Sequence, residues 1–161
     1  MGKRKKAGIF CAAIALAGII AGILLWNNRI ERQFPLWKTP CLEVDNSRTD
    51  PNVELRFEGI EHGVTLQNGE LCDQVTVNLK GISGQGISYN DLAWVDYFYN
   101  GEWHTVWENG LTVLSSRIIN GSDVREGEIP IRKSVSPGLF AREGQYRILI
   151  DGLGYCEIEI P

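Results

Sequence analysis

The chain has 161 residues, 43% of them hydrophobic, and a formal net charge of −4. All 20 acidic residues lie from Asn27 onward, with only 12 of the 16 basic ones, so this larger part carries a net charge of −8. Such an acidic segment argues against nucleic-acid binding, which requires a basic surface.

The N-terminus has the pattern of a membrane anchor. Residues 3–6 are all basic, and the twenty residues 7–26 contain no charged side chain. A helix of that length rises about 30 Å, the thickness of the hydrocarbon core, and Trp26 stands where an interfacial aromatic residue is expected. We predict a cytoplasmic tail at 1–6, a transmembrane helix at 7–26 and, by the positive-inside rule, an extracytoplasmic C-terminal part.

Two features of this segment leave alternatives open. The small residues around Ala15 and Ala17 match a signal-peptide cleavage site, but the apolar run continues beyond them, which favours a retained anchor in the cell membrane. Gly18 and Gly22 form a GxxxG spacing, which permits two such helices to pack as a homodimer. Glycine is also common in membrane helices without such a role.

The rest of the chain predicts a linker followed by an all-β domain. Prolines at 35, 40 and 51 disfavour a continuous helix in residues 27–52. From Val53 to Pro161, apolar and polar residues alternate, which is typical of strands with one buried face. The alternation is clearest at residues 53–57, 75–79, 128–132 and 156–160.

One hairpin is predicted in detail. Residues 92–99 and 102–108 flank Asn100-Gly101, the strongest short signal for a two-residue type I′ turn. This register places Trp94, Phe98, Trp103 and Trp107 on one face, and Val95, Tyr97, Tyr99, His104 and Val106 on the other. One face must pack on the core, and the other is a candidate binding surface, although cross-strand aromatic pairs also stabilise hairpins without binding anything.

The C-terminal part carries a family resemblance. The sequence 143–148, Glu-Gly-Gln-Tyr-Arg-Ile, resembles the tyrosine corner of immunoglobulin-like sandwiches. With the strand at 75–79 and the Asn-Gly-Glu-Trp hairpin at 100–103, it resembles bacterial immunoglobulin-like domains of exported and membrane-anchored proteins. A more distant likeness is to immunoglobulin-like bacterial proteinase inhibitors.

The resemblance implies an immunoglobulin-like antiparallel β-sandwich over 53–161, in which Tyr146 has a structural role. It also suggests that Trp94 is the core tryptophan of the third strand. The Trp94 face of the hairpin would then be buried and its other face exposed. The binding residues predicted at this hairpin are Tyr97, Tyr99, Trp103 and His104.

The cysteines leave the disulfide pairing open. Cys41, Cys72 and Cys156 follow the predicted membrane segment, so at most one intramolecular pair forms among them. If Cys41 begins the first strand, it lies near the start of the last strand, which favours Cys41–Cys156. If the first strand is 53–57 instead, Cys41 reaches Cys72. The cysteine and histidine spacings do not match a zinc site.

The sequence contains no recognisable catalytic set or cofactor motif. Neither His62 nor His104 belongs to a nucleophile motif, and the cluster of Glu58, Glu61 and His62 is as well explained by a solvated turn as by a metal site. We therefore expect a non-catalytic module that binds a protein partner at the membrane surface, through the hairpin and the loop 81–90. The alternative is a proteinase-inhibitor-like or regulatory domain that acts through a loop at 83–89 or 120–127.

Overall fold

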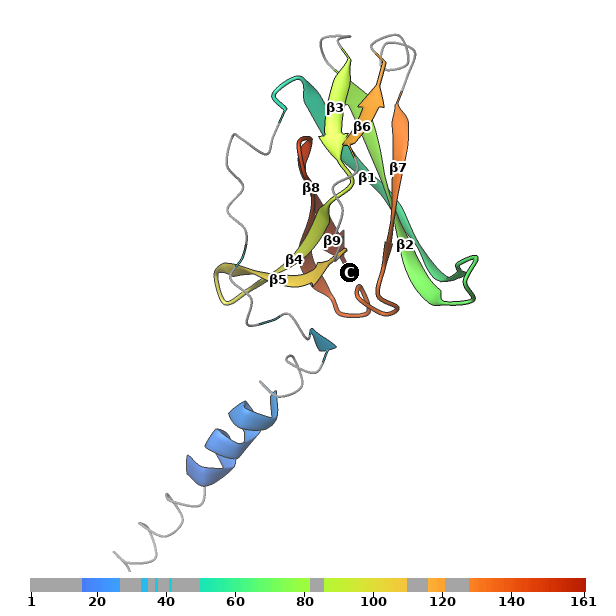
Figure 1. The fold of residues 1–161 in the computed structure, drawn as a ribbon. Coiled ribbons are helices and arrows are strands. Elements are labelled where there is room, and N and C mark those ends of the chain that lie inside the picture. Colours follow the sequence, from blue (N-terminus) through green and yellow to red (C-terminus); the bar gives the residue numbers. More distant parts are fainter. Residues whose placement is uncertain are drawn as a thin grey trace, which may run out of the picture. The chain divides into compact units, whose positions relative to one another are not determined.

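Figure 1 shows the fold of the chain in a computed structural model. The residues described by the structure are 16–26, 33, 34, 37, 41, 50–81, 86–109, 116–120 and 128–161. The chain divides into two compact units, Met1–Pro35 and Leu36–Pro161. Two described residues of the predicted linker, Trp37 and Cys41, belong to the second unit, where they contact His104 and Asp96.

The first unit contains a helix at residues 16–26, and all of its side chains are exposed. Leu16, Ile23 and Leu25 expose between 56% and 71% of their surface. Within the described part of the chain, no helix has the length and apolar character needed to span a membrane. Residues 7–15 of the predicted span lie outside the described residues. Gly18 and Gly22 lie on this helix, where an added Cβ atom would meet nothing within 4 Å outside the adjacent helix backbone, and the helix dimer stays a prediction.

The second unit is built from antiparallel β-strands, as the alternation predicts (Figure 1). The described strands are β1 (Val53–Thr65), β2 (Leu71–Gly81), β3 (Ile87–Asn90), β4 (Ala93–Tyr99), β5 (Glu102–Glu108), β6 (Ser116–Ile119), β7 (Ile129–Val135), β8 (Gly144–Ile150) and β9 (Gly154–Ile160). They form sheets with the orders β1-β2-β7, β3-β6 and β5-β4-β8-β9. The edge strands β1 and β9 of the two larger sheets contact each other.

Two short strands differ from the sequence prediction. Residues 81–90 were expected to form a loop, but Ile87–Asn90 is strand β3, which pairs with β6. Both strands have only four residues, and so short a segment shows no clear period-two pattern. Of the two loops considered for protease inhibition, 83–89 and 120–127, residues 83–85 and 121–127 lie outside the described residues.

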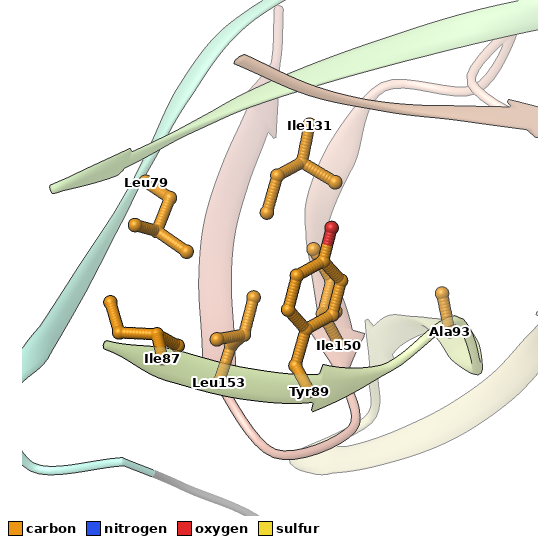
Figure 2. Packing of buried hydrophobic residues seen from close by; sticks show 7 residues of the cluster. All are labelled: Leu79, Ile87, Tyr89, Ala93, Ile131, Ile150 and Leu153. Carbon is orange, nitrogen blue, oxygen red and sulfur yellow. The ribbon is translucent and has the colours of Figure 1, made fainter. Parts of the chain in front are cut away.

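The hydrophobic core lies between the sheets. Leu79 and Ile131 from the β1-β2-β7 sheet meet Ile87 and Tyr89 from β3, together with Ile150 at the end of β8. Figure 2 shows these side chains gathered with Ala93 and Leu153 in one cluster. They are almost completely buried, so each contributes the full apolar transfer energy that drives folding.

The hairpin prediction is confirmed near its turn and wrong at its base. Asn100 and Gly101 have φ values of 52° and 88°, as a type I′ turn requires. Phe98 pairs with Trp103, as predicted, but Val95 pairs with Trp107 because a β-bulge follows. The bulge adds one residue to β5 and shifts Trp107 to the opposite face, where it packs against the core cluster.

A buried carboxylate on β2 connects this strand to β1 and to the turn at Gly138. Asp73 accepts hydrogen bonds from the Gly63 amide (3.1 Å) and the Gly138 amide (2.9 Å), and it lies 3.0 Å from Nδ1 of His62. Burial raises the pKa of the Asp73 carboxyl, but the hydrogen bonds from His62, Gly138 and Gly63 outweigh burial and lower the pKa overall. The stabilisation from this carboxylate is therefore present above the unfolded pKa of about 3.9 and is lost as the pH falls through the lower folded value.

Replacing Asp73 by Asn is expected to lower the free energy of unfolding at pH 7 by about 1–3 kcal/mol, since charge-assisted hydrogen bonds are lost. Between pH 5 and pH 2, the free energy of unfolding should fall by less in this variant than in the unchanged chain. Urea unfolding at several pH values measures both effects. Glu58→Gln, at an exposed position of β1, is the control. An unchanged pH profile in the Asp73 variant would contradict the argument.

Candidate functional site

The two faces of the β4–β5 hairpin have exchanged roles relative to the prediction. Val95 and Tyr97 are 0% and 5% exposed, whereas Trp94 and Phe98 are only half-buried. The neighbouring strand β8 explains this arrangement. Val95 and Tyr97 pair with Ile148 and Tyr146 of β8, whose side chains fill the interior. The predictions that Trp94 is the core tryptophan and that Tyr97 is exposed are therefore wrong.

The Tyr97 face of the hairpin is covered in part by an earlier residue of the same unit. The Trp37 ring stacks on the His104 ring, with centroids 4.1 Å apart and planes at 14°. The same indole meets the Tyr99 ring edge-on at 5.2 Å. Three of the four predicted binding residues, Tyr97, Tyr99 and His104, thus lie around Trp37. The fourth, Trp103, lies on the other face of the hairpin, which is directed away from the core.

The outer face of the β5-β4-β8-β9 sheet is centred on a buried ion pair. Arg147 donates from Nε to Asp96 Oδ2 at 2.8 Å, and the Thr105 hydroxyl donates to Asp96 Oδ1 at 2.8 Å. The side chains of Asp96 and Arg147 are only 1% and 13% exposed. A charge so far from water is tolerated because it is paired and hydrogen-bonded.

Aromatic side chains surround this ion pair. The Arg147 guanidinium lies 4.6 Å from the Trp103 ring centroid and 5.9 Å from that of Tyr155. Phe98 packs against Trp103 with centroids 5.1 Å apart. Tyr155 is 46% exposed, and Phe98 and Trp103 are half-buried. We call Phe98, Trp103 and Tyr155, arranged around Arg147, the outer aromatic surface.

The outer aromatic surface is bordered by carboxylates. Glu157 pairs with Arg147 across β8 and β9, and Glu159 follows two residues later on the same face. Glu108 lies opposite Trp94 at the base of the hairpin. All three glutamates are exposed. Since Arg147 is paired with Asp96, the exposed charge of this face is negative.

The predicted Cys41–Cys156 disulfide is absent, and Cys41, Cys72 and Cys156 are free thiols. Cys41 lies on the outer face, where its thiol donates to Asp96 (3.1 Å) and accepts from Arg147 (2.9 Å). Cys156 is buried beside Ile148, on the inner face of the same sheet. The sheet therefore separates the two sulfur atoms. Burial and the neighbouring Asp96 carboxylate raise the pKa of the Cys41 thiol to about 11, so it stays protonated at neutral pH.

Tyr146 has the structural role that the sequence indicates. It is fully buried near the start of β8, and its hydroxyl donates to the Arg142 carbonyl, four residues upstream, at 2.9 Å. Burial, followed by the charge of Tyr97, raises the pKa of the Tyr146 phenol above its usual value, and the hydroxyl therefore remains a hydrogen-bond donor.

The sequence predicts the aromatic hairpin, but it does not predict the ion pair at the centre of the outer aromatic surface. Asp96 is a charged residue within an otherwise apolar strand, and such a position is the one local signal of a buried partner. Its partners Arg147 and Cys41 lie 51 and 55 residues away in the chain, beyond the reach of any local pattern. Groups of His, Cys, Asp or Glu that suit a metal ion do not occur among the described residues.

Comparison of the chain with protein-family models, with curated proteins and with solved structures finds no match.

Proposed function

We propose that this protein is a non-catalytic interaction module. In this proposal, an immunoglobulin-like domain is held at the extracytoplasmic side of the cell membrane by a retained N-terminal anchor. The domain binds a protein partner through the outer aromatic surface. The single observation that carries the proposal is the cluster of partly exposed aromatic rings around the buried Asp96–Arg147 pair.

The immunoglobulin-like assignment is supported by Tyr146. Its hydroxyl bonds back to the backbone four residues upstream, which is the geometry of the tyrosine corner in such sandwiches. Two further features agree with it: the antiparallel β5-β4-β8-β9 and β1-β2-β7 sheets, and a core contributed by both.

The membrane assignment is supported by sequence and exposure. Residues 3–6 are basic and residues 7–26 are uncharged, as the positive-inside rule requires of an anchor with a cytoplasmic N-terminus. The helix at 16–26 exposes its apolar side chains all round, and a helix that is apolar on every side needs an apolar environment.

The binding assignment rests on the composition and order of the outer aromatic surface. Tryptophan, tyrosine and arginine are the residues that most often dominate the binding energy of protein interfaces. Here all three types meet on one sheet face, and regular strands hold them in position. Arg147 and Asp96 already satisfy each other, so covering them with a partner leaves no new buried group unpaired.

Photo-crosslinking in the native membrane tests this proposal without breaking the fold. A benzophenone amino acid replaces Tyr155, which is exposed on the outer face, or Arg132, which is exposed on β7 of the other sheet. We expect a crosslinked protein partner from position 155 and none from the control at 132. Adding Trp103→Ala to the position 155 probe should abolish the adduct, whereas Tyr99→Ala should leave it. Equal labelling at 132 and 155, or no adduct at 155, would overturn the proposal.

A further inference from the structure

We infer that the partner presents a cationic segment, rich in arginine or lysine, to the outer aromatic surface. This inference rests on the proposed function and names the chemistry of the partner. It follows from three properties of one sheet face: its charge, its accessible rings and the way it already holds a guanidinium.

The exposed charged side chains described on this face are all negative. On the outer side of β4, β5, β8 and β9, Arg147 is the one basic side chain among the described residues, and it is bound to Asp96. Glu108, Glu157 and Glu159 are exposed beside it. These carboxylates repel an acidic partner and attract a basic one, and such complementarity sets partner choice and the rate of encounter.

The rings of this face already show how a cation is accommodated. The Arg147 guanidinium lies over Trp103 and near Tyr155, so the chain itself forms cation–π contacts here. An indole is the best aromatic acceptor for such a contact, and tyrosine is also suitable. A partner guanidinium placed over the exposed part of Tyr155 would have Glu157 two residues away on the same strand face as a carboxylate acceptor.

The opposite sheet lacks this combination and serves as an internal comparison. The outer side of β1, β2 and β7 mixes Glu54 with Arg56, Lys80 and Arg132. Arg56 and Glu54 form an ion pair there at 2.9 Å. The described residues of that face include no aromatic side chain. A general attraction to the acidic domain would not distinguish the two sheets, whereas recognition by rings and carboxylates together would.

The test uses the full chain in a zwitterionic detergent, with hexa-arginine as the probe and hexa-citrulline as its uncharged counterpart. Binding is followed by the NMR signal of the Trp103 indole N–H, assigned by its loss in Trp103→Phe. We expect saturable shifts with hexa-arginine, weakening as salt is raised, and none with hexa-citrulline. The double variant Glu157→Gln/Glu159→Gln should weaken binding by about three- to tenfold, since exposed charge contacts are individually modest.

The matched control is Glu58→Gln/Glu61→Gln, which removes two exposed charges from β1 of the other sheet and should leave the affinity unchanged. Equal weakening by both double variants would reduce the effect to general charge attraction and overturn the inference. Equal binding of hexa-citrulline, or no saturable shift, would overturn it too. If the position 155 crosslink succeeds while hexa-arginine fails, only the cationic assignment is lost and the proposed function stands.

Discussion

Replacing Arg147 by Met is expected to lower the free energy of unfolding by about 3–5 kcal/mol, because it leaves a buried carboxylate without its counter-charge. Asp96 is 0% exposed, so its carboxylate is not solvated in the folded chain and depends on the guanidinium. The Thr105 hydroxyl and the Cys41 thiol would remain as donors, but neither is charged. Urea unfolding of the full chain in a mild detergent, followed by tryptophan fluorescence, measures the loss.

The control for this prediction is Arg132→Met, at an exposed position of β7, which should change stability by less than about 0.5 kcal/mol. The double variant Asp96→Asn/Arg147→Met should recover part of the loss, because no uncompensated charge remains and the amide can still accept from Thr105. We expect a coupling energy of at least about 1 kcal/mol in the complete cycle. Additive single effects would show that the pair does not act as a unit.

Replacing Asp91 by Ala is expected to cost about 3 kcal/mol or more, for the same reason with the signs of the charges reversed. Lys133 projects from β7 toward the interior, and its side chain is only 6% exposed. Its ammonium group is held by the Asp91 carboxylate and, at 3.0 Å, by the Asp91 carbonyl. With the carboxylate removed, a buried positive charge would retain only the carbonyl contact at this position.

Arg117→Ala tests the exposed ion pair of Asp91 separately from its buried ion pair with Lys133. Arg117 also reaches Asp91, at 3.0 Å, but its side chain is 61% exposed, so we expect its loss to cost less than about 1 kcal/mol.

Burial raises the pKa of Asp91, yet the hydrogen bonds from Lys133 and Arg117 outweigh it and lower the pKa. The stabilisation is thus present above the unfolded pKa and lost in acid. Urea unfolding at pH 7 and pH 3 should show a smaller difference in Asp91→Ala than in the unchanged chain; an equal difference would contradict the assignment.

Local patterns in the sequence determined the strands and the turn of the hairpin. Alternating apolar residues predicted β1, β2, β7 and β9 because one face of each strand is buried in a common core. Asn100-Gly101 predicted the type I′ turn because few other pairs tolerate positive φ at both positions. The position of Tyr146 was likewise recognisable, since its hydroxyl bonds to a carbonyl only four residues away.

Tertiary contacts alone decided which hairpin face packs on the core and which one is directed away from it. Both faces are aromatic, so composition did not distinguish them, and the choice followed from Ile148 and Tyr146 on a strand some 50 residues later. The β-bulge that turned Trp107 inward, Trp37 over His104, and Cys41 beside Asp96 also depend on segments distant in the chain. Burial is a property of the assembled sheets, and for that reason the outer aromatic surface emerged only from the structure.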